Sequence, residues 1–272
     1  MPTPTAATPT PARACDVRDR ILEHLGVLRV PVTAAQLDAV LSAAEQASWS
    51  HLQFLERLVG QQADQRRERA IERRIRDAKF PDSCTLETFD WEFNAKTIER
   101  SQIENLAMCE FIRRGNNVIF VGQSGVGKSH LIQGIGRRGC ALGYRVRYTT
   151  SSELLLDLTA SLADHTLPQC LRGYNRYQWL IIDDFGFDKL ERGAAPETPS
   201  LLFKIIDHRR RDRSTTVVTN LDFEKWEKDL GDSHLAMGLL DRLVDGAIIL
   251  KLQGRSYRAH RAQANAPAAR PR

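Results

Sequence analysis

The sequence lacks long apolar runs and closely spaced cysteines. No run approaches the roughly 20 apolar residues of a membrane-spanning helix, and the first residues lack the apolar core of a secretory signal. The five cysteines form no Cys-x-x-Cys pair and have no histidine at ligand spacing. This pattern disfavours a disulfide framework and a zinc site. We therefore expect a cytoplasmic protein with reduced thiols and no membrane partner.

The length of the chain indicates how many domains it can form, and its charge indicates which kinds of partner it favours. The chain has 272 residues, of which 42% are hydrophobic, so it is long enough for one large domain and a smaller module. The formal net charge is +5 and the pI is about 9.1. A basic balance of this size favours nucleic acid or an anionic surface as a partner, and net charge alone does not choose between them.

Composition divides the chain into segments. Residues 1–14 and 260–272 contain few large apolar groups and are predicted to be flexible tails. Residues 15–79 show apolar side chains at helical spacing and are predicted to form a small helical module. Phe80-Pro81 should end its last helix, because proline disfavours a helical residue before it. Residues 80–116 then form a linker with a helix that leads into the main domain, 117–259.

The main domain alternates short β-branched runs with amphipathic segments. NVIFVG, YRVRYTT, WLIIDD, TTVVTN and AIILKL have the composition of strands, and helical patterns such as KSHLIQGIGRRGCAL separate them. This alternation predicts an α/β fold, with a mainly parallel sheet covered by helices on both faces. Ligands bind such sheets at the edge where the strands end.

A phosphate-binding motif follows the first of these strands. The segment 122–129 fits G-x-x-x-x-G-K-[ST] and lies between a predicted strand and a predicted helix, the context that supports the motif. The alternative is a glycine-rich turn that only packs a strand on a helix. The predicted nucleotide-binding residues are Gly122, Gln123, Ser124, Gly125, Val126, Gly127, Lys128, Ser129 and the adjoining His130.

The motif assigns roles within the loop. Backbone N–H groups and the helix dipole should face phosphate oxygens, and the Lys128 ammonium should reach the β- and γ-phosphates. The Ser129 hydroxyl is placed to hold a metal ion. The expected cofactors are ATP and Mg²⁺.

Polar residues at two further strand ends are candidates for the same site. The apolar run 179–182 ends in Asp183, a predicted metal ligand, and Asp184, which is placed to orient or deprotonate the attacking water. The alternative is that this pair only caps a turn. Asn220 ends another strand and is a candidate to hold the water or sense the γ-phosphate, although a strand-terminal Asn is more often a turn residue.

These motifs together resemble a known family. GQSGVGKSHL, WLIIDDFG, TTVVTN and LLDRLVDGAIILKLQGRSYR are similar to the DnaC-type helicase loaders, and more closely to the IstB transposition helper ATPases. SWSHLQFLERLV, RRERAIERRIRDAKFPD and TLETFDWEF are similar to the segments that precede the phosphate loop in IstB. The resemblance covers Cys15–Arg258. It implies an AAA+ type P-loop NTPase, with a minimal or absent lid after the sheet.

The resemblance also implies roles for two arginines. In such AAA+ proteins an arginine from the adjacent subunit completes the site, and the family pattern places it at Arg242. A guanidinium supplied in this way stabilises the charge that develops on the γ-phosphoryl oxygens. Arg258 matches the position of a sensor that reads the nucleotide from its own subunit. The alternative for both is an ordinary surface arginine.

Clusters of basic residues are candidates for contact with DNA phosphates. A solvated helix with i,i+4 ion pairs is the alternative for the first cluster. No base-reading set of a known motif is visible, so we expect double-stranded DNA to be bound largely without sequence choice. The clusters are Arg66, Arg67, Arg69, Arg73, Arg74, Arg76 and Lys79; Arg137, Arg138, Arg145 and Arg147; and Arg209, Arg210, Arg211 and Arg213.

These observations predict an ATP-dependent helper of transposition that forms a homo-oligomer on DNA and acts with a partner transposase. The alternative within the same group is a DnaC-like loader of a replicative helicase. A small-molecule kinase would need an acceptor pocket and an arginine-rich lid, and neither is visible. A GTPase is disfavoured because Thr219-Asn220-Leu221-Asp222 is not Asn-Lys-x-Asp.

Overall fold

A computed structural model describes residues 14–186, 198–209, 212–221 and 233–264. The chain divides into two compact units between Ala70 and Ile71. This division falls within the long helix α3 (His51–Ala78), nine residues before the predicted end of the helical module at 79. The helix ends just before Phe80-Pro81, as the proline predicts, and Lys79 turns the chain with a φ of 58°.

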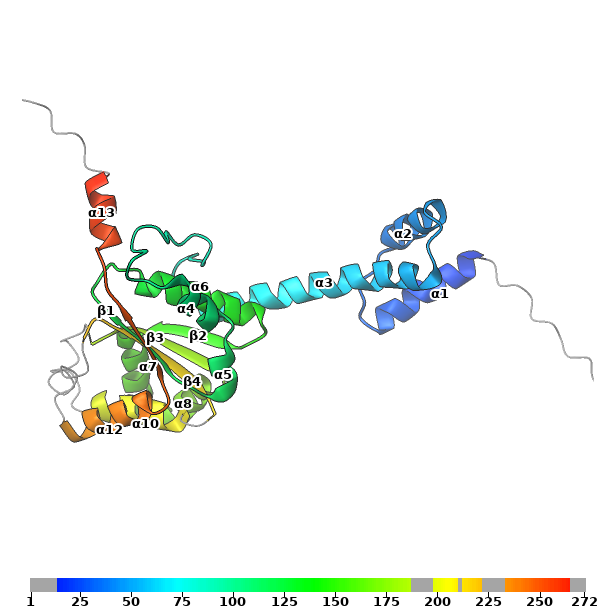
Figure 1. Cartoon of the computed structure of the whole chain (residues 1–272). Coiled ribbons are helices and arrows are strands. Elements are labelled where there is room, and N and C mark those ends of the chain that lie inside the picture. Colours follow the sequence, from blue (N-terminus) through cyan, green and yellow to red (C-terminus); the bar gives the residue numbers. More distant parts are fainter. Residues whose placement is uncertain (1–13, 187–197, 210–211, 222–232, 265–272) are drawn as a thin grey trace, which may run out of the picture. The chain divides into compact units, whose positions relative to one another are not determined.

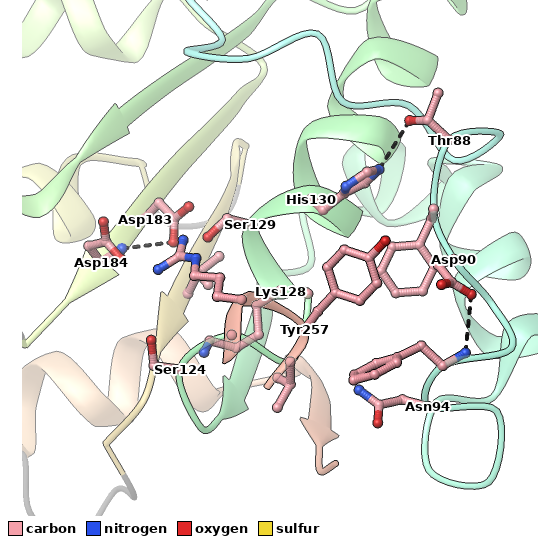
Figure 2. Close-up of a pocket in the computed structure, with 17 residues that line it drawn as sticks. Thr88, Asp90, Asn94, Ser124, Lys128, Ser129, His130, Asp183, Asp184 and Tyr257 are labelled. Carbon is pink, nitrogen blue, oxygen red and sulfur yellow. Dashed lines mark hydrogen bonds between the residues drawn. The ribbon is translucent and has the colours of Figure 1, made fainter. Parts of the chain in front are cut away.

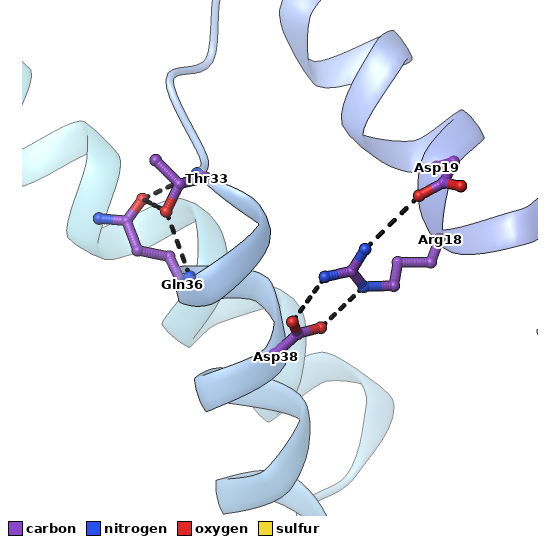
Figure 3. A network of polar contacts seen from close by, with 5 residues as sticks. All are labelled: Arg18, Asp19, Thr33, Gln36 and Asp38. Carbon is purple, nitrogen blue, oxygen red and sulfur yellow. Dashed lines mark hydrogen bonds and ion pairs between the residues drawn. The ribbon is translucent and has the colours of Figure 1, made fainter. Parts of the chain in front are cut away.

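The N-terminal unit contains α1 (Ala14–Val27), α2 (Ala34–Gln46) and the first part of α3. Thr33 and Gln36 cap the start of α2 with reciprocal side-chain to backbone hydrogen bonds. The Arg18 guanidinium donates to both carboxylate oxygens of Asp38, at 2.8 and 2.5 Å, and so joins α1 to α2 (Figure 3). That hydrogen bond lowers the pKa of the Asp38 carboxyl.

The second unit is built on a five-stranded parallel sheet in the order β2-β3-β4-β1-β5 (Figure 1). This arrangement confirms the predicted α/β fold, and the strands coincide with the β-branched runs. Their bounds are β1 Val118–Gly122, β2 Val146–Thr150, β3 Trp179–Phe185, β4 Ser214–Thr219 and β5 Ile248–Leu252.

Helices cover both faces of the sheet, because alternate residues of the buried strands point to opposite sides. On one face α4, α5 and α6 pack over a core that includes Phe120, Leu131 and Trp179. On the other face α7, α8, α10 and α12 pack over a core that includes Ile119 and Leu158. The bounds are α4 Arg100–Ala107, α5 Glu110–Arg114, α6 Lys128–Ala141, α7 Ser151–Ala163, α8 Leu167–Asn175, α10 Thr198–Arg209 and α12 Ser233–Val244.

The sheet is followed by one more helix in the described part of the chain, α13 (Tyr257–Ala264). It extends past residue 260, where the composition predicts the start of a flexible tail. Aromatic contacts explain the difference: the His260 ring lies 4.9 Å from the Phe93 ring, and Phe93 lies 5.1 Å from Tyr257. Packing against a distant loop thus orders a segment whose own composition is poor in apolar groups.

The predicted DNA contact of Arg209 is wrong, because this side chain is buried in the fold. Its side chain is 1% exposed, and it donates to the carbonyls of Tyr174 at 2.7 Å and Ser214 at 2.9 Å and to the Thr215 hydroxyl at 3.1 Å. Burial lowers the pKa of its guanidinium. A cation held in this way fixes the end of α8 to the start of β4 and is not available to phosphate.

The other arginines of the cluster 209–213 are not buried as Arg209 is, or lie outside the described residues. Arg213 is half-buried and donates to the carbonyl of Asn175 at 3.1 Å. Arg210 and Arg211 lie outside the described residues. This third cluster therefore gives weaker support to a DNA-binding surface than the sequence suggests.

Arg209→Met should destabilise the fold by about 3 kcal/mol, because the substitution leaves buried carbonyls without donors. Urea denaturation measures the free energy of unfolding. The matched control is Arg172→Met, which removes an exposed arginine from α8 and should change stability by no more than about 0.5 kcal/mol. Equal stability of the two variants would contradict the structural role of Arg209.

Candidate functional site

The phosphate loop joins β1 to α6 at the edge where the strands end. Gly125 and Gly127 have φ values of 83° and 104°, a region that favours glycine. A Cβ at 125 would lie 2.1 Å from Ser256 Oγ, and one at 127 would lie 2.7 Å from a ring carbon of Phe89. The loop therefore follows a path that only glycine permits, with distant segments packed directly against it.

Lys128 projects its ammonium into the centre of this loop. Nζ donates to the carbonyls of Gly122 at 2.7 Å and Gln123 at 2.9 Å. Burial lowers the pKa of Lys128, while the negative charges of Asp183 and Asp184 act in the opposite direction. The lysine is thus a buried cation whose hydrogen bonds go to neutral carbonyls, and anionic phosphate oxygens would be stronger acceptors.

The two carboxylates lie at the end of β3, where its register with β4 shifts between Ile182 and Phe185. Asp183 is 1% exposed and accepts hydrogen bonds from the Tyr148 hydroxyl at 2.5 Å and from the Asp184 N–H at 2.8 Å. Asp184 is exposed and has a φ of 54°, which is strained for a residue other than glycine. The backbone thus buries one carboxylate and turns the next toward the cavity.

Both predicted metal ligands line this cavity. Ser129 offers a hydroxyl oxygen from α6, and Asp183 offers a carboxylate oxygen from β3. Mg²⁺ is commonly held by one or two protein oxygens together with substrate phosphates and water, so these residues fit the ion. Figure 2 shows Asp183, Asp184, Ser129 and Lys128 grouped on one side of the cavity.

An aromatic wall forms the other side and was not predicted from the sequence. Phe89, Phe93 and Tyr257 line the cavity, and the rings of Phe93 and Tyr257 are nearly perpendicular, with centroids 5.1 Å apart. Asn94 joins the two segments by hydrogen bonds to the backbone of Arg255, at 3.0 and 3.1 Å. Aromatic faces stack on nucleobases, so this wall can hold the base of a nucleotide whose phosphates lie at Lys128.

His130 has a second role besides lining the cavity. Its Nε2 lies 3.2 Å from the Thr88 hydroxyl and 2.9 Å from the Thr85 carbonyl, and its ring meets the edge of Phe89. The histidine therefore fastens the loop that carries the aromatic wall to the helix that carries the phosphate site.

The structure brings most of the predicted site residues together. Gly122 and Gln123 do not line the cavity themselves, but their carbonyls accept hydrogen bonds from Lys128, which does. The predicted residues that line the cavity are Ser124, Gly125, Val126, Gly127, Lys128, Ser129, His130, Asp183, Asp184 and Arg258. Arg258 also lies near enough to Lys128 for its charge to lower the lysine pKa.

Two predicted catalytic residues are not among the residues that line this cavity. Asn220 follows β4, and its Oδ1 is buried without a hydrogen-bond partner among the described residues. Arg242 lies on α12, where its Nε is 2.6 Å from Asp207 Oδ1. Within one chain, therefore, the arginine is not part of the cavity that holds Lys128.

The sequence contained a signal for the aromatic wall. TLETFDWEF and SYR belong to the segments that carry the family resemblance, but their ring-bearing residues had no assigned role. Phe89 and Tyr257 are 168 positions apart in the chain. Only the contact between their segments shows that both serve one cavity.

Residues 23–265 match the family described as IstB-like ATP binding protein. The chain is 33% identical over 242 residues to the ATP-binding protein of insertion sequence IS5376 from Geobacillus stearothermophilus, with 89% of this chain and 94% of that protein covered. It is 30% identical over 234 residues to the ATP-binding protein of insertion sequence IS21 from Pseudomonas aeruginosa, with 86% of each covered.

Solved structures support the fold. DnaI matches with a TM-score of 0.52 and 19% identity over 62% of this chain and 91% of that one. DnaA from Aquifex aeolicus, bound to AMPPCP, matches with a TM-score of 0.51 and 20% identity over 68% of this chain and 55% of that one. The fold is that of an AAA+ P-loop domain. Among the described residues, no helix combines the length and apolar character needed to cross a membrane.

Tyr257→Ala should weaken ATP binding by roughly 10-fold or more, because stacking of a base on an aromatic ring contributes about 1–3 kcal/mol. Titration with a fluorescent ATP analogue measures the dissociation constant. Tyr257→Phe keeps the ring and should bind nearly as well as the unchanged protein. Inorganic triphosphate, which has no base, should bind all three proteins equally; a loss for Tyr257→Ala here would contradict a base-stacking role.

Proposed function

Because the chain belongs to the family of IstB-like ATP binding proteins, we propose that it is an Mg-ATP hydrolysing helper of transposition. In this proposal ATP-bound subunits assemble on double-stranded DNA and present it to a partner transposase, and hydrolysis controls the assembly. The observation that carries it is the cavity that gathers Lys128, Ser129, Asp183 and Asp184 in a chain similar to insertion-sequence proteins.

In this proposal each residue of the site has a separate role in ATP binding or hydrolysis. When the triphosphate binds, the Lys128 ammonium exchanges the carbonyls of the loop for phosphate oxygens. Ser129 and Asp183 would hold Mg²⁺, which neutralises phosphate charge when bound. Asp184, turned toward the cavity by its left-handed backbone, orients the attacking water and accepts its proton. Asn220 Oδ1 has no hydrogen-bond partner among the described residues and does not line the cavity, so it would have to move to accept a hydrogen bond from that water.

Arg242 has a place in this scheme as a residue supplied to a neighbouring subunit. It does not line the cavity of its own chain, and it is paired with Asp207 of α10, which supports a role outside its own cavity. A neighbour that received this guanidinium would hydrolyse ATP only within an assembly. This arrangement would couple chemistry to oligomer formation.

DNA binding is supported by arginines that remain accessible. On α3 the side chains of Arg66, Arg69, Arg73 and Arg76 are exposed, and Arg67 forms an exposed pair with Asp64. Arg138 and Arg145 are exposed on the second unit. Exposed guanidinium groups that meet phosphates give affinity without base choice, and such binding weakens steeply as salt rises.

The direct test measures ATPase rate and particle size with and without duplex DNA, each with ATP and ADP. We expect duplex DNA and ATP together to give large particles and faster hydrolysis. A chain that stays monomeric with DNA and a non-hydrolysable ATP analogue would overturn the proposal. Capture of a replicative helicase in place of a transposase would support a DnaC-like loader instead.

Asp184→Asn should retain ATP binding and lower the hydrolysis rate at least about 100-fold, because the amide cannot accept the proton of the attacking water. The variant should remain as an ATP-bound assembly on DNA, which sedimentation measures. Asp164→Asn changes an exposed acid after α7 and serves as the matched control. Normal hydrolysis by Asp184→Asn would show that another group activates the water.

Arg242→Ala should leave ATP binding by an isolated subunit unchanged and lower hydrolysis in the assembly by about 10³-fold, the typical effect of removing an arginine supplied by a neighbour. Fluorescent-analogue titration and steady-state hydrolysis measure the two quantities. Arg172→Ala is the control for loss of an exposed arginine. Weaker ATP binding by the isolated subunit would instead indicate a role in its own cavity.

A further inference from the structure

Arg242 is held by a set of three residues on two helices. Its Nε is 2.6 Å from Asp207 Oδ1, and its Nη1 donates to the Gly238 carbonyl at 3.1 Å. The plane of the guanidinium lies over the Phe203 ring, 4.3 Å from the ring centre. We call Phe203, Asp207 and Gly238 the arginine seat.

The arginine seat holds two nitrogens of the guanidinium, Nε and Nη1. An arginine has five N–H donors, and these contacts use the one on Nε and one on Nη1. Among the described residues the other three donors, which include both on Nη2, have no hydrogen-bond partner. The side chain is 24% exposed, so it is partly accessible at the surface. The fork geometry of such donors matches the oxygens of a phosphoryl group.

Helix stability does not explain why these residues occupy these positions. Asp207 is near the C-terminus of α10, where the helix dipole disfavours a negative charge. Gly238 is in the interior of α12, where alanine would favour the helix. A Cβ at 238 would lie 3.1 Å from a ring carbon of Phe203 and 3.7 Å from Arg242 Nη1. Asp207 and Gly238 are therefore unfavourable for their own helices, but they make the contacts that hold Arg242.

We propose that the arginine seat positions Arg242 for the active site of a neighbouring subunit, with Asp207 as the principal positioning residue. This inference rests on the proposed function, in which Arg242 completes that site. A free arginine explores many rotamers, and ordering them during the reaction costs free energy. The arginine seat orders the side chain before the subunits meet, so the guanidinium arrives in one orientation.

Asp207→Ala should lower kcat in the DNA-bound assembly about 10-fold and leave the KM for ATP unchanged, because the guanidinium is retained but no longer oriented. Asp207→Asn keeps an oxygen that can accept from Nε and should recover part of the rate. The free energy of unfolding and the particle size on DNA are measured for each variant. A fall in kcat that followed a loss of stability or assembly would overturn the proposal.

Gly238→Ala separates positioning from stability. The added methyl group must displace the Phe203 ring, on which the guanidinium lies, by a few tenths of an ångström, while the intrinsic preference of α12 for a helix improves. We expect a lower kcat in a protein that is at least as stable as the unchanged one. An unchanged kcat would contradict a requirement for room at this position.

Mixing of subunits provides the decisive test. Asp184→Asn subunits should bind ATP and assemble without hydrolysing it, and they carry an intact Arg242, whereas Asp207→Ala subunits have an intact phosphate loop and an intact Asp184. A mixture of the two should hydrolyse ATP faster than either variant alone, because the first supplies a positioned arginine to the second. Absence of complementation would show that Asp207 acts within its own subunit and would overturn the proposal.

The same experiments distinguish a failure of the proposed role of Arg242 from a failure of the positioning role of Asp207. If Arg242→Ala hydrolyses ATP normally in the assembly, the proposed role of Arg242 fails, and the positioning role fails with it. If Arg242→Ala loses activity and Asp207→Ala does not, only the positioning role fails. A faster rate for Asp207→Ala would show that the ion pair restrains Arg242, which is the opposite of the proposal.

Discussion

The phosphate loop is packed directly against two segments that are far from it in sequence, and the rest of the site depends on this close contact. Gly125 leaves no room for a side chain beside Ser256, and Gly127 leaves none beside Phe89. Because the glycines have no Cβ, the segments after β5 and before α4 can approach the loop. They bring Phe93 and Tyr257 to the same cavity as Lys128. The close contact thus joins the aromatic wall to the phosphate loop.

Opposite charges lie close together in this cavity. The Lys128 ammonium is buried beside Asp183 and Asp184, and all its hydrogen bonds in the described residues go to carbonyls of the loop. Asp183 is held by Tyr148 and by the backbone of Asp184. The bonds to Asp183 fix that carboxylate in place, so binding does not have to organise it. Such preorganisation is the main way in which proteins promote transfer of a phosphoryl group.

The arginines of this chain differ in burial, and burial limits which groups each guanidinium can contact. Arg209 is buried and holds backbone carbonyls, so it stabilises the fold. Arg242 is partly exposed, and it donates to Asp207 and to the Gly238 carbonyl through Nε and Nη1. Arg66 and Arg69 are exposed on α3 and suit contact with phosphates. The depth at which each guanidinium lies therefore decides whether it holds backbone groups of the fold or remains accessible at the surface.

Local patterns in the sequence determined the parallel sheet, the phosphate loop and the acidic end of β3, because each depends on residues adjacent in the chain. The sequence also placed the end of α3 before Phe80-Pro81, since proline acts on its immediate neighbours. Only the tertiary structure revealed the aromatic wall, the burial of Arg209 and the arginine seat. These features depend on contacts between segments that lie far apart in the chain, and no local periodicity specifies which distant residues will meet.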